Sequence, residues 1–234
     1  MEKLTIDTCY NCDCKDLMQA MKEQGLKADW CITDPPYGIG YDKQANNVGS
    51  TQNGNSLAPK REYASKGWDN ERIGGGYFDL MLECSKEQII FGGNYYTDIL
   101  PPTKSWLVWN KRSISSTDRN DFADCELAWC SKGVARVINY VYNGMIQGDM
   151  KNKDYRFHPT QKPTQLWVKI LNLYTKKNDL ILDPFAGSQS LRIACHKMQR
   201  HYIGAELDKE YYEKGCKWFE QETLQLSIFD IIDD

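Results

Sequence analysis

Three short apolar runs in this sequence each stop at an acidic residue. The runs and the residues that follow them are 28–33 before Asp34, 179–182 before Asp183, and 201–205 before Glu206. Continuous apolar runs of this length are typical of strands that are buried on both faces in a parallel sheet. The acidic residues are therefore expected at the carboxyl ends of strands, where open α/β sheets bind their ligands.

Helical patterns separate the apolar runs. Leu191, Ala194, Cys195 and Met198 follow the i, i+3, i+4, i+7 spacing of one helix face. Further helices are expected at 14–24, 76–84, 208–222 and between Pro163 and Tyr174, and further strands at 87–91 and 105–109. Strands that alternate with helices predict an α/β fold, whose mostly parallel sheet carries helices on both faces.

Two stretches interrupt this alternation. Residues 38–76 are rich in Gly, Asn, Ser and Lys, and so long a loop in a compact domain is usually a functional lid or a disordered segment. A flexible lid or DNA-contact loop is expected here. Residues 125–158 contain β-like runs and basic residues, which indicates a β-hairpin excursion off the sheet. With 41% hydrophobic residues over 234 positions, the chain suits a single domain, 1–234, with a modest insertion.

The charge and cysteine counts exclude several classes of protein. A net charge of −3 excludes a strongly basic nucleic-acid binder, so a polyanion must meet a local patch. Residues 103–176 hold 12 basic and 6 acidic residues, which suits either a surface that faces a polyanion or an ordinary solvated surface. No apolar run is long enough to cross a bilayer and no export signal is evident, which favours the cytoplasm. Nine cysteines without a second close pair favour reduced thiols and no metal site.

The first motif is Asp34-Pro35-Pro36-Tyr37, directly after an apolar run. The prolines stiffen the backbone and lack N–H donors, while their carbonyls still accept hydrogen bonds. The Asp34 carboxylate and the Pro35 carbonyl thus offer two acceptors beside the ring of Tyr37. A nucleobase with an exocyclic amine has two N–H donors and a π-face, and these match the two acceptors and the ring. The other interpretation is a stiff turn with a capping aspartate.

The second motif runs from Asp183 to Ser190 and joins a predicted strand to a predicted helix. Gly187 permits a tight turn and a close approach to a ligand, and the following helix start offers free N–H groups. The motif matches neither the P-loop nor the dinucleotide fingerprint. About twenty residues later Glu206 ends the next run, where an acidic residue suits ribose hydroxyls. The expected ligand is a nucleoside with a carboxylate tail.

The third motif is His158-Pro159-Thr160-Gln161-Lys162-Pro163, a rigid polar loop before a helix. Taken together and in this order, the three motifs resemble the circularly permuted, beta-class DNA amino-methyltransferases, and the resemblance covers nearly the whole chain. The segment 91–96 and the stretch Asn11-Cys12-Asp13-Cys14 are similar to that family too. The resemblance implies a Rossmann-like fold that depends on S-adenosylmethionine and has a small β or loop insertion for target recognition.

The resemblance also assigns roles to individual residues. Asp34, Pro35, Pro36 and Tyr37 hold the target base and catalyse methyl transfer. The cofactor residues that it implies are Asp13, Thr160, Lys162, Asp183, Phe185, Ala186, Gly187, Ser188 and Glu206, with Asp13 at the adenine amine, Glu206 at the ribose, and Thr160 and Lys162 near the methionine carboxylate. His158 is expected to position its loop. No cysteine is needed as a nucleophile.

One position departs from the family pattern in a way that bears on activity. Gln189 stands where relatives have a second glycine, so its side chain either crowds the cofactor or points away. Cys12 also replaces a common glycine. The implied activity is methylation of adenine N6 in double-stranded DNA, in the manner of restriction-modification enzymes. The alternatives are cytosine N4, and a weak or inactive DNA-binding relative.

Two further segments carry expectations about partners. Residues 130–157 form the expected target-recognition segment, whose DNA contacts are Lys132, Arg136, Lys151, Lys153 and Arg156. The tail 223–234 contains Gln225, Leu226, Ile228 and Phe229, which resemble the peptide that docks in extended form on the bacterial sliding clamp. A bacterial or phage origin fits the resemblance, and neither the oligomeric state nor the target sequence follows from these residues.

Overall fold

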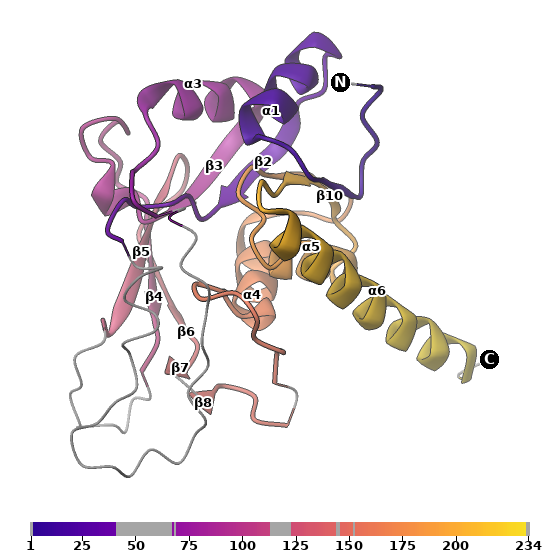
Figure 1. Ribbon diagram of the computed structural model, residues 1–234. Coiled ribbons are helices and arrows are strands. Elements are labelled where there is room, and N and C mark those ends of the chain that lie inside the picture. The colour runs from indigo at the N-terminus through magenta and orange to yellow at the C-terminus, as the bar shows by residue number, and fades with distance from the viewer. Residues whose placement is uncertain are drawn as a thin grey trace.

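The protein is built on one mixed sheet with helices on both sides, as Figure 1 shows. The computed structural model describes residues 2–40, 67, 69–112, 123–143, 146–151 and 153–232. In this part of the chain the sheet strands are β1 (Thr8–Tyr10), β2 (Ala28–Thr33), β3 (Ser85–Phe91), β4 (Trp106–Asn110), β5 (Cys125–Cys130), β6 (Arg136–Asn139), β9 (Leu180–Asp183) and β10 (His201–Ala205). The helices are α1 (Cys14–Glu23), α3 (Gly75–Cys84), η1 (Gly93–Tyr95), α4 (Thr164–Tyr174), α5 (Ser190–Lys197) and α6 (Lys209–Ile232).

The order of the strands creates a crevice in the middle of the sheet. The order is β1-β10-β9-β2-β3-β5-β4-β6, and the first five strands are parallel. The chain leaves β2 toward β3 but leaves β9 toward β10, so the strand order reverses between β2 and β9. Cys31 lies opposite Leu182 in this pair. Asp34 and Asp183 therefore both lie at the carboxyl ends of these strands, at the switch point where such sheets bind ligands.

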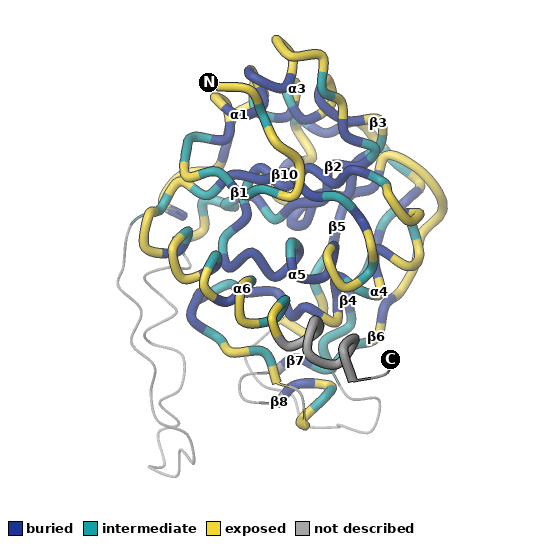
Figure 2. The backbone as a smooth tube through the Cα atoms, turned by 90° about the vertical axis from the view of Figure 1, so that its right-hand side faces the viewer, coloured by how far each residue is buried: buried dark blue, intermediate teal, exposed yellow. Residues whose placement is uncertain are grey.

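The helices cover both faces of the sheet, as the sequence predicts. Ile89 and Ile90 are neighbours on β3 and both are fully buried. Ile89 belongs to the core cluster that includes α4 and α5, whereas Ile90 belongs to the cluster that includes α1 and α3. The two-residue period of a strand sends neighbouring side chains to opposite faces, so one strand serves both cores. Figure 2 shows the central strands as buried and the outer turns as exposed.

The sheet extends further than the sequence predicts. Residues 125–158 are expected to leave the sheet as a hairpin, but β5 inserts between β3 and β4, antiparallel to both. Ala128, Trp129 and Cys130 are buried there, and this burial favours the sheet interior over an exposed hairpin. β6 joins β4 in parallel at the edge. Only β7 (Tyr142–Asn143) and β8 (Ile146–Gln147) form a separate antiparallel pair.

The C-terminal segment also differs from expectation. The sequence predicts a helix that ends near residue 222 and an extended tail, but α6 continues to Ile232. The extended peptide on which the predicted sliding-clamp contact depends is therefore replaced by helix. The expected lid at 38–76 lies largely outside the described residues. No helix in the described part of the chain is both long and apolar enough to span a membrane.

Candidate active site

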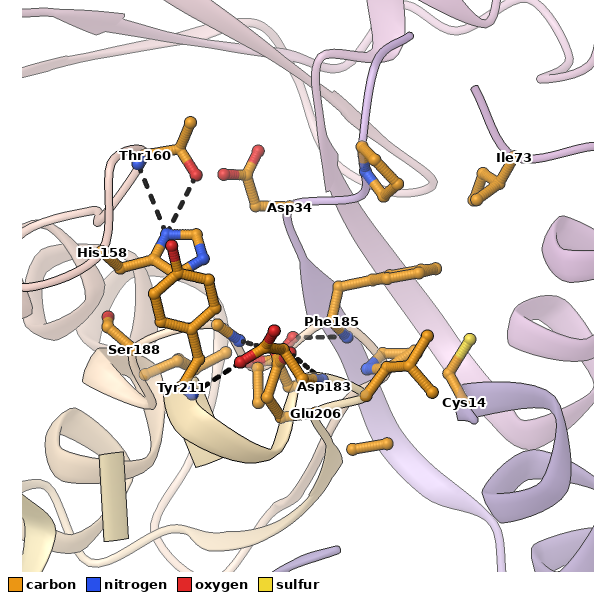
Figure 3. Close-up of a pocket in the computed structure, with 18 of the residues that line it drawn as sticks. Cys14, Asp34, Ile73, His158, Thr160, Asp183, Phe185, Ser188, Glu206 and Tyr211 are labelled. Atoms are coloured by element: carbon orange, nitrogen blue, oxygen red, sulfur yellow. Dashed lines mark hydrogen bonds between the residues drawn. The ribbon is translucent and has the colours of Figure 1, made fainter. Parts of the chain in front are cut away.

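A cavity of about 810 Å³ opens at the carboxyl edge of the parallel strands. It brings residues of all three motifs together. Of the residues predicted from sequence, the cavity is lined by Asp13, Asp34, Pro36, His158, Thr160, Lys162, Asp183, Phe185, Ala186, Gly187, Ser188 and Glu206. Figure 3 shows the carboxylates of Asp34 and Glu206 facing the cavity from different strands. Pro35 and Tyr37 lie next to it and are not among the lining residues.

Both oxygens of Asp34 are engaged by neighbouring side chains. The Tyr37 hydroxyl donates to Oδ1, and the Lys162 ammonium donates to Oδ2. These contacts join the first motif to the third and fix the plane of the carboxylate. Each carboxylate oxygen has two lone pairs, so Asp34 keeps acceptor capacity toward a ligand. The sequence analysis places Lys162 near a cofactor carboxylate. In the structure its ammonium pairs with the Asp34 carboxylate.

Lys162 is shared between two carboxylates. Its Nζ lies 3.1 Å from Glu126 Oε2 and 4.8 Å from the centroid of the Phe91 ring. The other oxygen of Glu126 accepts a hydrogen bond from Lys111 Nζ at 3.0 Å. The Lys162 side chain is only 6% exposed, so the pairing is strong enough to offset the cost of burying its charge. Two acids and two lysines thus form one neutral group.

The two acids of this group differ in proton affinity. Burial raises the pKa of Asp34; Lys162 opposes the rise and the negative charge of Glu126 adds to it. Burial also acts to raise the pKa of Glu126, but Lys162 and Lys111 together hold that pKa below its usual value. Burial tends to lower the pKa of Lys162, and the two carboxylates outweigh it and raise that pKa. Asp34 is therefore the better proton acceptor of the two.

The ring of Tyr37 is held in place by two neighbours. It stacks on Tyr95, with ring centroids 4.9 Å apart and an interplanar angle of 17°. Its edge lies against Gly92, where an added Cβ would come within 2.0 Å of Tyr37 Cε1. The Tyr96 hydroxyl donates to the Pro36 carbonyl and braces the backbone of the same motif. Tyr95 covers one face of the Tyr37 ring, so a base can stack only on the other face. The expected stacking of Tyr37 on a base remains a prediction.

Asp183 lies at the floor of the cavity, where it is 4% exposed. Its Oδ1 accepts a hydrogen bond from Thr33 Oγ1 at 2.8 Å, which ties the end of β9 to the end of β2. Burial raises the pKa of Asp183 to about 7, although the hydrogen bond from Thr33 opposes the rise.

Glu206 organises the turn after β9. Its Oε2 accepts a hydrogen bond from the Gly187 N–H at 2.7 Å, and its Oε1 accepts one from the Asp208 N–H at 2.8 Å. Gly187 has a φ of +51°, a conformation that favours glycine. The sequence-predicted pair of Gly187 and Glu206 is thus in direct contact, and the carboxylate faces the cavity with lone pairs left for a ligand.

The opposite wall of the cavity comes from α1 and α3. Asp13 caps the start of α1, where its Oδ1 accepts from the Lys15 N–H at 2.8 Å. Tyr77 on α3 also lines the cavity, and its ring centroid is 6.3 Å from that of Phe185. Lys15 Nζ lies 4.1 Å from the centroid of the Tyr77 ring. These aromatic and acidic groups make this end of the cavity suitable for a flat, amine-bearing ring.

His158 supports its loop through contacts made by its ring. Its Nδ1 lies 3.2 Å from Thr160 Oγ1 and 3.4 Å from the Thr160 nitrogen. The ring meets that of Tyr211 edge-on, with centroids 4.3 Å apart. His158 is 8% exposed. These contacts agree with the predicted positioning role.

Gln189 points away from the cavity. It adopts the left-handed conformation with a φ of 62° at the start of α5, a conformation that favours glycine. The side chain is fully buried between α5 and α6, where its Nε2 donates to the Tyr212 carbonyl at 2.9 Å. Of the two outcomes considered for this residue, crowding of the cofactor is the wrong one.

The predicted DNA-contact residues separate into two groups. Lys132 follows β5 at the amino end of β3, where it pairs with Glu87 at 3.2 Å, and Arg136 begins β6 on the same side. Both lie toward the sheet edge opposite the cavity. Lys151, Lys153 and Arg156 instead precede the His158 loop, and Arg156 Nη2 donates to the Pro159 carbonyl.

Several site residues escaped the sequence analysis. Glu126 and Lys111 complete the charged group around Lys162, and Tyr77, Glu71 and Tyr211 line the cavity. Glu126 sits at the start of an antiparallel strand, so an analysis based on residues that follow parallel strands does not find it. Among the described residues no group of three or more His, Cys, Asp or Glu side chains is arranged to hold a metal ion.

Comparisons with curated proteins give short and long matches. The chain is 36% identical over 83 residues to type II methyltransferase M.HpaI of Haemophilus parainfluenzae, which covers 36% of this chain and 26% of that protein. DNA adenine methyltransferase YhdJ of Escherichia coli is 38% identical over 64 residues, or 27% of this chain and 22% of that protein. Putative methylase YubD of Escherichia coli is 24% identical over 211 residues, 87% of this chain and 86% of that protein. The first two matches thus span about a quarter of those relatives.

Solved structures share the fold. The M1.HpyAVI–SAM complex matches with a TM-score of 0.57 and 24% identity, over 90% of this chain and 98% of that one. PvuII DNA methyltransferase, described as cytosine-N4-specific, matches with a TM-score of 0.55 and 15% identity, over 92% and 89%. The family model for the N6/N4 DNA methylases matches residues 96–217, which include the second and third motifs. Because this match covers more than half of the chain, the chain belongs to the N6/N4 DNA methylase family.

Proposed function

We propose that this protein transfers a methyl group from S-adenosylmethionine to the exocyclic N6 amine of adenine in double-stranded DNA. The observation that carries the proposal is the single cavity that joins the Asp34-Pro35-Pro36-Tyr37 motif to Phe185, Gly187 and Glu206. An amine acceptor and a nucleoside site must share one space for methyl transfer, because the reacting atoms have to meet at about 3 Å.

The residues present fit the cofactor. A volume of about 810 Å³ is within the range of small-molecule sites and leaves room for a second ligand. Glu206 offers acceptor lone pairs to the ribose hydroxyls, Asp13 offers a carboxylate to an adenine amine, and Phe185 offers an apolar face. When bound, S-adenosylmethionine supplies an electrophilic methyl group on a sulfonium centre.

The other half of the cavity fits the target base. A base amine in a duplex is paired and stacked, so it must be flipped out to reach the cavity. Asp34 and the Pro35 carbonyl accept hydrogen bonds from the two N–H groups, which draws the nitrogen lone pair out of conjugation with the ring. Stacking on an aromatic side chain such as Tyr37 adds roughly 1–3 kcal/mol per base.

The chemical step then needs no covalent enzyme intermediate. The amine nitrogen forms a bond to the methyl carbon as the carbon–sulfur bond breaks, and the sulfur keeps that electron pair. The methylated nitrogen, now positively charged, gives one proton to the Asp34 carboxylate. Burial and the nearby Glu126 raise the pKa of Asp34, which suits it to accept this proton. Positioning supplies much of the rate.

Cytosine N4 is the second candidate for the target. The fold is shared with PvuII DNA methyltransferase, which is described as cytosine-N4-specific, so the fold does not separate the two amines. The aspartate at position 34 favours adenine, since the resemblance associates serine there with cytosine enzymes. The short match to a DNA adenine methyltransferase supports the same choice.

An inactive DNA-binding relative is the weaker alternative. It rests on Gln189, whose side chain is buried between α5 and α6 and leaves the cavity open. We therefore expect Gln189→Gly to change the rate of methyl transfer by less than about twofold. A gain of activity far above that would show that Gln189 does restrict the site.

The deciding experiment is transfer of labelled methyl from S-adenosylmethionine to unmethylated bacterial DNA, followed by analysis of the nucleosides. N6-methyldeoxyadenosine is the expected product, whereas N4-methyldeoxycytidine would overturn the choice of base. Asp34→Ala should abolish transfer, and Asp79→Asn on the exposed side of α3 is the matched control. A folded wild-type protein that labels neither base would overturn the proposal.

A further inference from the structure

Glu126 is outside the three motifs and does not line the cavity, yet it contacts the same lysine as Asp34. It lies near the start of β5, opposite Trp109 of β4. Because β5 runs antiparallel to β3, its start reaches the same sheet edge at which the parallel strands end. The fold thus delivers a second carboxylate next to the first from the opposite strand direction.

The Lys162 ammonium has three neighbours, two carboxylates and one aromatic ring. Its Nζ donates a hydrogen bond to Asp34 Oδ2, forms an ion pair with Glu126 Oε2 at 3.1 Å, and stands over the Phe91 ring. Two negative charges and an aromatic face on different sides of Nζ restrict where the ammonium can lie. The position of Lys162, and through it that of Asp34 Oδ2, depends on Glu126.

Lys111 completes the arrangement from β4. It holds Glu126 Oε1 at 3.0 Å and leaves Oε2 for Lys162. Without Lys111, three charged groups would share this site with a net negative charge. With it, the charges sum to zero, and both carboxylates can stay ionised in a poorly solvated place.

We propose that Glu126, supported by Lys111, is a positioning residue that sets the orientation and charge environment of Asp34 through Lys162. This inference rests on the proposed function, because it assigns Asp34 the roles of amine acceptor and proton acceptor. Glu126 touches neither ligand; it determines how much of the Lys162 charge Asp34 receives.

The sign of the effect follows from the groups that face Asp34. These groups are Lys162, Glu126 on β5, Tyr37, Tyr96 after η1, and Asp183 on β9. Removal of the Glu126 charge leaves Lys162 to Asp34 alone, so the pKa of Asp34 falls. A less basic Asp34 accepts the proton from the methylated amine less readily, and the turnover number falls with it.

The first test does not depend on activity. The titration of Asp34 is followed by NMR of protein labelled with ¹³C at aspartate carboxyls, and its signal is assigned by its loss in Asp34→Asn. In Glu126→Gln the midpoint should fall by about one pH unit, and Glu126→Asp should restore it because the charge is kept. An unmoved midpoint in Glu126→Gln would overturn the proposal.

The second test uses methyl transfer. In Glu126→Gln we expect the turnover number to fall about tenfold. The acid limb of the plot of turnover number against pH should move to lower pH. The dissociation constant for S-adenosylmethionine should stay within about twofold, because Glu126 does not line the cavity. If the affinity for S-adenosylmethionine fell while the acid limb stayed in place, the charged group around Lys162 would serve cofactor binding instead. That result would overturn the proposal.

Glu87→Gln is the matched control for this series. It makes the same substitution on the neighbouring strand and also breaks a glutamate–lysine pair, with Lys132, at the opposite edge of the sheet. It should move neither the Asp34 midpoint nor the acid limb. A wild-type protein that methylates no DNA would count against the proposed function, while the NMR midpoints would still decide the role of Glu126.

Discussion

The side-chain amide of Gln189 donates a hydrogen bond to the main-chain carbonyl of Tyr212 at 2.9 Å, across the contact between α5 and α6. Arg192 Nη1 in turn donates to Gln189 Oε1 at 3.0 Å. The side chain passes over Gly215, where an added Cβ would lie 2.5 Å from Gln189 Nε2. The buried glutamine side chain is therefore accommodated by a glycine on the facing helix.

Gly215→Ala should destabilise the protein by about 1–2 kcal/mol. The new methyl group crowds Gln189, which costs more than the roughly 1 kcal/mol that alanine gains over glycine in a helix. The free energy of unfolding in urea measures the effect. In the Gln189→Gly background the same substitution should become stabilising, since the crowding partner is gone. A substitution that destabilises both backgrounds alike would contradict the packing described here.

Gly92→Ala should impair catalysis far more than cofactor binding. The added Cβ would lie 2.0 Å from Tyr37 Cε1, and Gly92 has a φ of +65°, so the ring of Tyr37 must shift. Tyr37 holds Asp34, and a misplacement of about 1 Å at a reacting group costs on the order of 100-fold in rate. Turnover and cofactor affinity, measured side by side, check this. Equal losses in both would point to general unfolding instead.

Asp183 should make the protein less stable as the pH rises. Its pKa is raised to about 7 in the folded state, so the native protein holds a proton that the unfolded chain gives up from about pH 4 upward. This contribution to stability is complete at low pH and is lost as the pH rises through 7. Between pH 5 and 8 the wild type should lose about 3 kcal/mol more than Asp183→Asn.

Urea unfolding across that range measures the difference. The asparagine oxygen still accepts the hydrogen bond from Thr33, so the substitution removes the titration with little change in packing. Asp79→Asn on the exposed side of α3 serves as the control and should follow the wild type. Parallel curves for wild type and Asp183→Asn would show that Asp183 titrates normally.

Glu206→Gln should weaken the binding of S-adenosylmethionine by about 10- to 100-fold. Each carboxylate oxygen of Glu206 accepts a backbone N–H, and an amide nitrogen at either place opposes a donor with a donor. A hydrogen bond to a charged group contributes about 1.5–3 kcal/mol, which gives this range. Isothermal titration calorimetry measures the affinity. Glu210→Gln, in the first turn of α6, is the control that should bind as the wild type does.

The two groups of predicted DNA contacts should behave differently. Lys151 and Lys153 are exposed beside the loop that reaches the cavity. The double variant Lys151→Ala/Lys153→Ala should therefore weaken DNA binding. The slope of the logarithm of the binding constant against the logarithm of salt concentration should become shallower by about two. Lys132 pairs with Glu87 at the opposite edge, and Lys132→Ala should leave the slope unchanged. Fluorescence anisotropy at several salt concentrations distinguishes them. A larger effect of Lys132 would place the DNA on the other face.

The elements that the sequence predicts well are those with a strong local pattern. The run 28–33 matches β2, and the run 201–205 matches β10, residue for residue. Each is continuous and apolar, and each stops at a residue that lines the cavity. The meeting of Asp34, Asp183 and Glu206 was predictable too, because parallel strands bring their carboxyl ends to one edge.

The elements that the sequence predicts poorly depend on partners distant in the chain. Cys125–Cys130 reads locally as one arm of a hairpin, and only the gap between β3 and β4 makes it an inner strand. Glu126 is then one acidic residue among many until that insertion places it beside Lys162. The direction of Gln189 likewise depends on Gly215, and no local pattern couples these two positions.

The placement of β1 has a consequence for how the chain acquires its shape. Thr8–Tyr10 pairs with β10 and with no other strand in the described part of the chain, and Asn11 Nδ2 donates to the Glu206 carbonyl at 2.8 Å. Residues up to 205 must be synthesised before His201–Ala205 exists to receive this strand. Pairing of two parallel strands so far apart in the sequence is slow. The entropy cost of closing the intervening loop comes before the contacts that stabilise the pair. The cavity wall at Asp13 is thus expected to form last, and a nascent chain stalled before residue 201 should hold β2 and β3 without the wall that β1 and β10 provide.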